Sequence, residues 1–386
     1  AVDHLQIARE LGPLIESCSD EIERIRDLPD NLFERLIEHD LFRLVQPRDY
    51  GGAEVSPLEI VRFIEEIGRH DASTAWCLGQ NNICGAIAAW MEPDAAREVF
   101  SSPRQILAWG PGPGEAHAVP GGYRLSGRFD FASGSRHATW LGAHVPVYLA
   151  DGSRKPAVDG STTPYTLLFP RESVEVKDTW QVIGLKGTGS DSYVVEDLFV
   201  PEHRVVARHL STPRRVAGRL YALTQSNLYA SSFSGLALGI ARAYIDDFVG
   251  RMRDTIPRGA ARSRGHNHVV QSKVGQSEAR LRSARAFLYE TVEEIWSTVQ
   301  SGADPSLDEL VRLRLASTWA TQQAREIIAD LYLAAGALAI FESQPFERRF
   351  RDIHTVAQQI QGHAAHFETC GQILMGMKPD RSMFTF

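Results

Sequence analysis

The chain of 386 residues contains no run of 18 or more apolar residues, and this absence excludes a helix that crosses a membrane. Its first residues are not a basic segment leading into an apolar one, so we expect no secretory signal and a cytoplasmic location. Acidic residues outnumber basic ones by 48 to 41. The resulting net charge of −7 argues against general nucleic-acid binding, which needs a basic surface.

Cysteine is scarce as well. The four cysteines form no CxxC pair and no cluster with metal-ligand spacing, which predicts reduced, buried thiols. His363 and His366 are three residues apart, but no acidic residue follows at ligand spacing, so no metal site is expected. A GxGxxG motif after a strand is also absent, and we therefore expect no NAD(P)H site in this chain.

The hydrophobic periodicity divides the chain into three segments. Residues 1–105 show apolar residues at three- and four-residue spacing and predict an N-terminal helical domain. Residues 106–205 change to alternation and turn residues, which predicts a small central β-barrel or, alternatively, a sandwich. Residues 206–386 return to helical spacing over long stretches and predict a C-terminal four-helix bundle. The predicted fold class is therefore α+β and mainly α.

The most informative stretch is residues 122–140, GYRLSGRFDFASGSRHATW. From Tyr123 to Phe131 apolar and polar residues alternate, which predicts a half-buried strand with Phe129 and Phe131 on its apolar face. The strand breaks into residues 132–135, ASGS, whose backbone N–H groups and hydroxyls suit the polar edge of a planar ring. An ordinary antiparallel strand and turn would show the same pattern.

This stretch resembles the flavin-contacting strand of the acyl-CoA dehydrogenase superfamily, in its flavin-dependent monooxygenase branch. A second segment, GLKGTGS at 184–190 followed by DLFVP at 197–201, is similar to the GLRGTGS…VFVP segment of that family. A third, AWGPGPG at 108–114, resembles the dehydrogenase segment TEPxxGS, although Trp109 and Gly110 replace its Thr and Glu. The helical, β and helical segments follow in family order over nearly the whole chain.

The resemblance implies a flavin site, for FAD or FMN, that the three segments build together. The segment at 108–114 would lay its backbone against the cofactor, the strand end would flank the ring, and the glycine-rich turn would offer hydroxyl donors. A core position under a loop explains Trp109 equally well. The cofactor-contacting residues that the resemblance implies are Trp109, Gly110, Pro111, Gly114, Phe131, Ala132, Ser133, Gly187, Thr188 and Ser190.

A carboxylate that the dehydrogenases require is missing. They use a Glu to remove the α-proton of an acyl thioester while hydride leaves for the flavin. The segment PFERRFRD at 345–352 resembles their C-terminal motif, and a gapless count from it places Ile360 where the Glu stands. The other family location of the base corresponds to Tyr229, and no Asp or Glu occurs between Glu202 and Asp246. An FAD-dependent acyl-CoA dehydrogenase with an unrecognised base is therefore the alternative rather than the main prediction.

The monooxygenase branch needs no such base. There, reduced flavin reacts with O₂ to a C4a-(hydro)peroxide that oxygenates a small aromatic or heteroatom-containing substrate. A Ser of the strand-end loop and a His of the C-terminal helix often act in that branch, and Ser133 matches the Ser. Gln359 stands where the His commonly falls, while His354 lies five residues earlier. The second catalytic role therefore belongs to His354, to Gln359 or to neither.

The sequence thus predicts a flavin-dependent monooxygenase. The candidates for its substrate pocket are Tyr229 and the pair Asn81 and Asn82, although the two amides would look the same as satisfied buried groups. Because no NAD(P)H site is expected, a separate flavin reductase is implied. The flavin site of the family lies between subunits, so the resemblance also implies a homotetramer. A flavin-binding or scaffold protein without catalysis is the remaining alternative.

Overall fold

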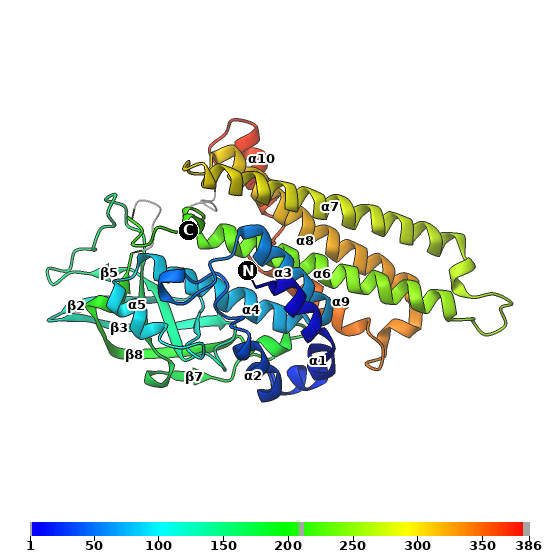
Figure 1. Cartoon of the computed structure of the whole chain (residues 1–386), viewed down its shortest axis with the longest axis horizontal. Helices are drawn as coiled ribbons and strands as arrows, with labels where there is room; N and C mark the ends of the chain where they lie inside the picture. Colours follow the sequence, from blue (N-terminus) through cyan, green and yellow to red (C-terminus); the bar gives the residue numbers. More distant parts are fainter. Residues whose placement is uncertain (1, 208–211, 381–386) are drawn as a thin grey trace.

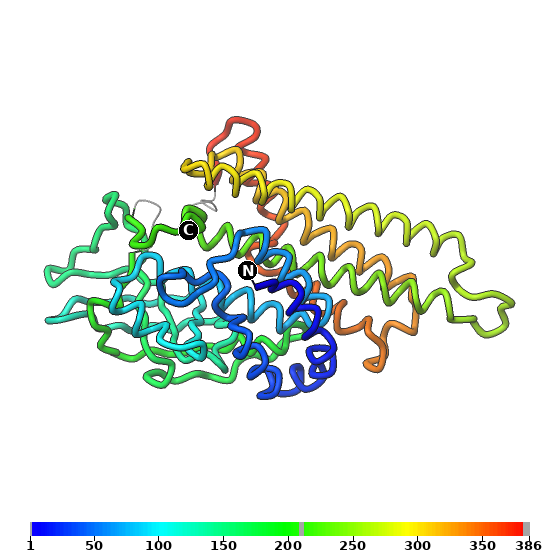
Figure 2. Tube along the Cα trace, viewed as in Figure 1, coloured from blue at the N-terminus to red at the C-terminus, as the bar shows by residue number. Residues whose placement is uncertain are grey.

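The computed structural model describes residues 2–207 and 212–380, and the statements below refer to these. The N-terminal helices lie between a β region and a bundle of long helices that extends away from the strands (Figure 1). The colours of Figure 2 show the chain passing from the helices into the β region and then into the bundle. The predicted α+β, mainly α order of helix, strand and helix is therefore confirmed.

The N-terminal region is built from helices that pack in layers. Ser56 caps the third of them by accepting a hydrogen bond from the Glu59 N–H at 3.2 Å, and Pro57 occupies its first turn. The fourth is rich in small and apolar residues and is buried almost all round. The helices are α1 (His4–Ile25), α2 (Asp30–Glu38), α3 (Pro57–His70), α4 (Ala72–Gly85) and α5 (Pro93–Val99).

The middle of the chain forms two sheets, with the strand orders β1-β4-β6-β9 and β5-β2-β3-β8-β7. Hydrogen bonds do not close the described strands into the β-barrel that we predicted, because the edge strands β5, β7 and β9 are only two or three residues long. The strands are β1 (Leu107–Trp109), β2 (Gly114–Val119), β3 (Gly122–Ala132), β4 (Trp140–Val145), β5 (Val147–Tyr148), β6 (Tyr165–Pro170), β7 (Glu175–Lys177), β8 (Asp191–Pro201) and β9 (Val205–Val206).

Strand β3 runs antiparallel to β8, with Phe129 opposite Tyr193. Phe129 is buried, as the alternation predicts, but Phe131 is 63% exposed and does not share its face. The register shifts between Phe129 and Ala132, and Phe131 adopts a left-handed φ of 60°. This irregularity at the end of the strand rotates the Phe131 ring off the buried face.

The C-terminal region is the predicted bundle. Its long helices α6 (Gln225–Asp254), α7 (His268–Gln300) and α8 (Leu307–Ala335) lie side by side, with the shorter α9 (Glu347–Gln358) against α8. A last helix, α10 (His366–Leu374), also packs on α8.

Helix α3 packs directly on α6. A Cβ at Gly235 would lie 2.8 Å from the carbonyl oxygen of Val61, and a Cβ at Gly68 would lie 2.8 Å from a methyl group of Leu236. Backbones approach this closely only where a side chain is missing. One hydrophobic core continues from α1 through both sheets into the bundle. The domain limits at 1–105, 106–205 and 206–386 stay predictions.

All four cysteines are free thiols in the interior. Burial raises the pKa of Cys77 well above its usual range and that of Cys370 to about 11. No group of three or more His, Cys, Asp or Glu side chains within residues 2–207 and 212–380 is arranged to hold a metal ion. The same part of the chain has no helix with the length and apolarity that a membrane span requires.

Candidate functional site

Ser133 belongs to a buried chain of hydroxyl groups that joins two of the segments predicted to hold flavin. Its Oγ lies 2.9 Å from the indole nitrogen of Trp76 and 2.7 Å from Ser190 Oγ. Ser190 Oγ lies 2.7 Å from Thr188 Oγ1, which donates to the Leu185 carbonyl at 2.9 Å. The three hydroxyl residues are at most 5% exposed. The strand end and the glycine-rich turn therefore meet through their side chains.

Which hydroxyl donates in each of these hydrogen bonds follows from the groups at the two ends of the chain, the Leu185 carbonyl and the Trp76 N–H, because a hydroxyl has one proton to donate. Thr188 donates its proton to the Leu185 carbonyl, so Ser190 donates to Thr188. Ser133 then donates to Ser190, while the Trp76 N–H donates to Ser133. One lone pair of Ser133 Oγ is left over. In this arrangement Ser133 Oγ is able to accept one further hydrogen bond, whereas Thr188 and Ser190 donate their hydroxyl protons within the chain and not outward as the sequence predicted.

The ring of Phe131 stands at the exposed edge of the same turn. The Ser133 N–H donates to the Phe131 carbonyl at 2.9 Å, so the two residues form one tight unit around the buried Ala132. The Phe131 ring meets Trp180 edge to face, with ring centres 6.1 Å apart at 84°. A left-handed φ is strained for a phenylalanine and is found where function requires it. The backbone here holds a flat apolar surface toward solvent.

The segment at 108–114 lies against the end of β3. The Asp130 N–H donates to the Pro111 carbonyl at 2.9 Å. A Cβ at Gly110 would collide with the carbonyl oxygen of Asp130, so only glycine allows this approach. Gly110 and Pro111 are thereby brought next to the turn that carries Phe131 and Ser133.

Trp109 and Gly114 pack against other residues of the β region. The Trp109 side chain is 5% exposed and meets His144 edge to face, with ring centres 4.8 Å apart. A Cβ at Gly114 would lie 2.9 Å from the ring of Phe129. Of the two interpretations open for Trp109, the structure favours the core position, because its ring packs inside the sheet instead of lying at an open face.

The glycine-rich turn is η4 (Lys186–Thr188), and it is wedged against α1 and α4. The Gly187 N–H donates to Ser73 Oγ at 3.1 Å, and a Cβ at Gly187 would collide with a methyl group of Ile22. Leu185 before the turn and Gly189 after it have left-handed φ values of 51° and 47°. These two positions turn the chain sharply, and the predicted residue Gly187 is required by close packing.

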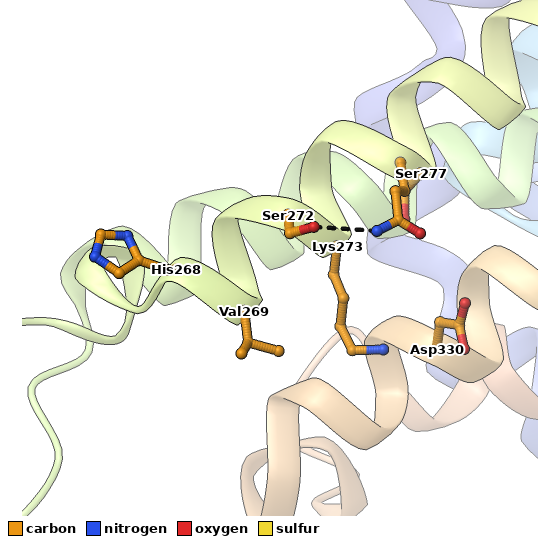
Figure 3. Close-up of a pocket in the computed structure, with 7 residues that line it drawn as sticks. His268, Val269, Ser272, Lys273, Ser277 and Asp330 are labelled. Atoms are coloured by element: carbon orange, nitrogen blue, oxygen red, sulfur yellow. Dashed lines mark hydrogen bonds between the residues drawn. The ribbon is translucent and has the colours of Figure 1, made fainter.

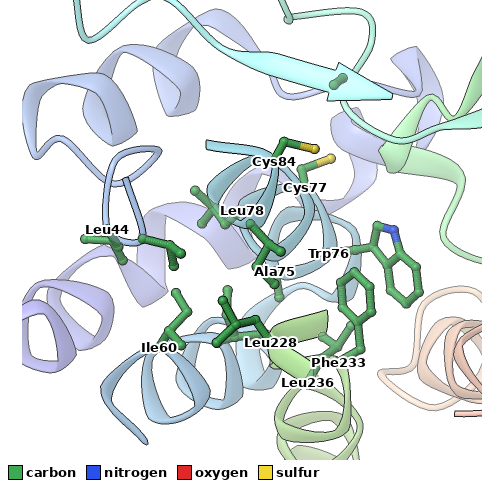
Figure 4. Packing of buried hydrophobic residues seen from close by; sticks show 14 of the residues in the cluster. Leu44, Ile60, Ala75, Trp76, Cys77, Leu78, Cys84, Leu228, Phe233 and Leu236 are labelled. Atoms are coloured by element: carbon green, nitrogen blue, oxygen red, sulfur yellow. The ribbon is translucent and has the colours of Figure 1, made fainter. Parts of the chain in front are cut away.

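Trp76 also begins an aromatic stack. Its ring lies parallel to that of Phe233 in α6, with ring centres 3.8 Å apart (Figure 4). Tyr229, one turn earlier in α6, stacks on Phe233 at 5.6 Å, and its hydroxyl lies 3.4 Å from Cys84 Sγ. The stack places flat apolar surface directly beside Ser133, as recognition of an aromatic molecule requires.

Asn81 and Asn82 differ in what they contact. Asn81 Nδ2 donates to the backbone carbonyl of Ser133 at 3.4 Å, and its Oδ1 lies 3.1 Å from His137 Nε2. The amide of Asn82 is fully buried and forms hydrogen bonds with backbone groups of α4 and of residues 41–45. Asn82 therefore fixes a loop, and we do not retain it in the proposed substrate pocket.

His354 lies on the α8 side of α9. Its ring packs against Phe350, with ring centres 4.4 Å apart, and Phe350 stacks on Tyr332 of α8. Burial, together with the positive charge of Arg325, lowers the pKa of His354, so its ring is neutral at pH 7. A different face of α9 meets the glycine-rich turn. The structure does not bring His354 to Ser133.

Gln359 follows the last residue of α9 and has an extended backbone conformation. Its Oε1 accepts the N–H of Gln361 at 2.6 Å. The neighbouring Ile360, at the position of the dehydrogenase Glu, is 62% exposed. The catalytic roles of His354 and Gln359 stay predictions.

Two cavities lie away from the hydroxyl chain. One of about 350 Å³ is lined by Val269, Lys273 and Asp330, among others, between α7 and α8 (Figure 3). The other, of about 450 Å³, lies between α1, the end of α3 and α9. Neither is lined by a residue of the predicted site.

Comparison with known proteins places these features in a family. The family described as "Acyl-CoA dehydrogenase, N-terminal domain" matches residues 7–100, and "Acyl-CoA dehydrogenase, C-terminal domain" matches residues 231–366. The chain is 28% identical to an indole-3-acetate monooxygenase of Pseudomonas putida over 95% of each protein. It is also 28% identical to the oxygenase component of an FADH₂-dependent resorcinol hydroxylase of Rhizobium sp., over 96% of this chain and 93% of that protein.

The fold has close relatives among solved structures. The crystal structure of a 3-HSA hydroxylase from Rhodococcus sp. RHA1 matches with a TM-score of 0.90 and 24% identity, and the match covers 99% of both chains. Both terminal domains and the fold of the whole chain therefore agree, and this chain belongs to the acyl-CoA dehydrogenase family.

Proposed function

We propose that this protein is the oxygenase component of a two-component flavin-dependent monooxygenase. It uses a reduced flavin and O₂ to oxygenate a small aromatic or heteroatom-containing substrate. The observation that carries the proposal is the buried hydroxyl chain at Ser133, which lies beside an aromatic stack. The names of the two similar proteins, a monooxygenase and a hydroxylase oxygenase component, support it. Acyl-CoA dehydrogenation is less well supported, because Ile360 and Tyr229 occupy the two positions of the base.

The residues of the site fit a flavin, as FAD or FMN. Gly110 leaves room for close backbone approach, and the exposed ring of Phe131 offers a flat face beside it. A reduced flavin carries ring N–H donors that the oxidised ring lacks. The lone pair that remains on Ser133 Oγ is free to accept a hydrogen bond from such a donor. The bound flavin supplies the chemistry that activates oxygen.

The protein's own residues orient the reactants and exclude water. Trp76 fixes the Ser133 hydroxyl, whose remaining lone pair would accept a hydrogen bond from a bound flavin. The partners of Ser190 and Thr188 are all within the protein, so these two hydroxyls do not draw water into the site. Phe233 is covered by Trp76 and Tyr229, so we assign the aromatic part of the substrate to the partly exposed Tyr229 end of the stack.

Rapid mixing tests the proposal. Protein loaded anaerobically with reduced flavin and then mixed with O₂ is expected to show a transient near-ultraviolet absorbance that oxidised flavin lacks. Without substrate this absorbance should decay with release of hydrogen peroxide, and with a suitable aromatic compound an oxygenated product should form. Oxidation at the rate of free flavin, with no transient, would contradict the proposal.

Ser133→Ala is expected to weaken reduced-flavin binding or to shorten the transient several-fold, because one neutral hydrogen bond is worth about 0.5–1.5 kcal/mol. It also leaves the Trp76 N–H and the Ser190 hydroxyl without their buried partner, so the free energy of unfolding should fall by about 1–3 kcal/mol. Ser234→Ala is the control, since that buried hydroxyl bonds to the Ala230 carbonyl within α6. Unchanged affinity and lifetime in Ser133→Ala would remove Ser133 from the site.

We also propose that the protein is a homotetramer that receives reduced flavin from a separate reductase. Leu333 and Met375 are each 77% exposed, and other large apolar side chains are exposed with them. Soluble monomers rarely leave this much apolar surface uncovered, and further copies of the chain would cover it. Exposed apolar side chains in α8, just after it and at the C-terminal end of α10 include Trp319, Leu333, Ile340, Phe341, Leu374 and Met375.

Light scattering at micromolar concentration is expected to give a mass of about four times the 42.8 kDa of one chain. Leu333→Glu introduces a charge into the apolar surface and should shift the mass toward smaller species, because burying an unpaired carboxylate is costly. Glu326→Gln, on the same helix, should leave the mass unchanged. A monomeric mass for the unmodified protein would contradict the proposed assembly.

A further inference from the structure

A buried carboxyl group holds the glycine-rich turn from the side of α9. Asp352 is 5% exposed, and its Oδ1 accepts the Leu185 N–H at 2.7 Å. Leu185 is the residue whose carbonyl ends the hydroxyl chain, and its φ of 51° is left-handed. Such a conformation is unfavourable for leucine and persists only where surrounding contacts fix it. Asp352 supplies one of those contacts.

Helix α9 and the turn are packed in direct contact around this bond. A Cβ at Gly184 would collide with the carbonyl oxygen of Arg351 and with the hydroxyl of Thr355. The carbonyl of Leu185 accepts the indole N–H of Trp180 at 2.9 Å in addition to the Thr188 hydroxyl. Both backbone groups of Leu185 are thus fixed. A change at Asp352 therefore acts on the end of the hydroxyl chain that begins at Ser133.

Asp352 also lines the cavity of about 450 Å³ between α1, α3 and α9. Asp71 lines the same cavity and caps α4, the helix of Trp76, by accepting the Thr74 N–H at 2.7 Å. The cavity gives protons a route to both carboxyl groups. The charged and titratable groups that line it or act on Asp352 are Glu16, Asp20, Glu23, His70, Asp71, Asp247, Glu342, Arg348, Arg349 and Arg351.

Burial raises the pKa of Asp352 to about 7, against the opposing hydrogen bond from Leu185. The ordinary range of an aspartate lies near pH 4, so this carboxyl group changes charge in the neutral range instead. Glu23 does not, because its hydrogen bonds to Arg351 and Arg348 outweigh burial and lower its pKa to about 2. The neighbouring carboxylates of Glu66 and Glu16 raise the pKa of His70, which lines the same cavity, so His70 needs a control.

We propose that Asp352 is a positioning residue for the flavin site: its carboxylate fixes the turn at Leu185, and protonation through the cavity loosens the turn and weakens reduced-flavin binding. A carboxylate accepts an N–H more strongly than a neutral carboxyl group does. The flavin part of this inference rests on the proposed function. The coupling between Asp352 and the turn is a property of the chain itself.

Local order and global stability change in opposite directions under this inference. As pH falls through about 7, the turn loses its charged partner and becomes less ordered. The folded protein binds this proton more tightly than the unfolded chain, so Asp352 lowers global stability as pH rises from about 4 to about 7. Acid unfolding of the whole protein would instead loosen the turn and the fold together.

Hydrogen exchange of the flavin-free protein tests the coupling. After correction for the intrinsic pH dependence of exchange, amides in residues 183–190 are expected to exchange about tenfold faster at pH 6 than at pH 8. Asp352→Asn keeps the volume and an acceptor oxygen but cannot ionise, and it should remove the pH difference. His70→Gln should keep it, and loss of the pH difference in His70→Gln would overturn the proposal even if the Asn variant does not fold. Equal protection at both pH values would overturn the proposal.

Anaerobic titration with reduced flavin tests the consequence for binding. Because reduced flavin titrates itself, the comparison is between wild type and Asp352→Asn at pH 6 and pH 8. Wild type is expected to lose several-fold more affinity than the variant on acidification. Equal pH dependence in both proteins would overturn the role of Asp352 and leave the proposed function intact. If neither protein binds reduced flavin while the exchange result holds, the proposed function fails and the coupling stands.

Discussion

Gly110→Ala is expected to weaken reduced-flavin binding by about a hundredfold or more and to lower the free energy of unfolding by about 1–3 kcal/mol. The new Cβ would collide with the carbonyl oxygen of Asp130 and lie 3.1 Å from the Ala132 nitrogen. Both are backbone atoms at the end of β3, so only a movement of the turn that carries Phe131 and Ser133 relieves the collision. Anaerobic titration and chemical denaturation measure the two effects.

Gly275→Ala is the matched control. Gly275 lies inside α7, where a Cβ would have nothing within 4 Å. Alanine is the better helix former, so this variant should gain about 0.5–1 kcal/mol of stability and bind flavin as the wild type does. Wild-type flavin affinity in Gly110→Ala would show that the segment at 108–114 is not part of the flavin site.

An acyl-CoA added without O₂ is expected to leave the absorbance of protein-bound oxidised flavin unchanged. Removal of the α-proton needs a base, and the two family positions hold Ile360 and Tyr229. An alkyl group accepts no proton, and a phenol near neutral pH is already protonated. The Tyr229 hydroxyl also lies 3.4 Å from Cys84 Sγ. Anaerobic bleaching by any acyl-CoA would overturn the monooxygenase proposal and favour the dehydrogenase alternative.

Ile360→Glu sharpens that comparison by placing a carboxylate at the family position. We expect no dehydrogenase activity from it, because the side chain at position 360 lies largely in solvent rather than in an enclosed site. Ile360 is 62% exposed, so the carboxylate stays hydrated and the free energy of unfolding should change by less than about 0.5 kcal/mol. Bleaching by acyl-CoA in the variant but not in the wild type would show that only the base was missing.

The order of the elements could be predicted from the sequence, because it depends on local signals. Alternation along β3 and the glycines around Thr188 are readable without a structure. That Ser133 and Ser190 approach to 2.7 Å could be expected only from the order of the family motifs. The pairing itself is a tertiary contact with no signature in either segment.

The outward ring of Phe131 and the role of Trp76 could not be predicted. Alternation assigned Phe131 to the buried face, and a register shift at the strand end is invisible to a period of two. Trp76 gave one weak signal, a large ring within a helix of small residues, which is equally typical of a core position. Its hydrogen bond to Ser133 joins residues far apart in the chain. The hydrogen bond between Asp352 and Leu185 could not be predicted for the same reason.

The burial of the thiols affects which side chains hydrogen peroxide can oxidise. An oxygenase releases hydrogen peroxide whenever oxygen activation runs without substrate, and peroxide attacks thiolates rather than thiols. Burial keeps Cys77 and Cys370 protonated. Among residues 2–207 and 212–380, the most exposed sulfur-containing residues are Met375 and Met377, which are 77% and 57% exposed. Subunits that cover these methionines would protect them from the hydrogen peroxide that the enzyme releases. Loss of assembly would then increase the oxidation of both side chains.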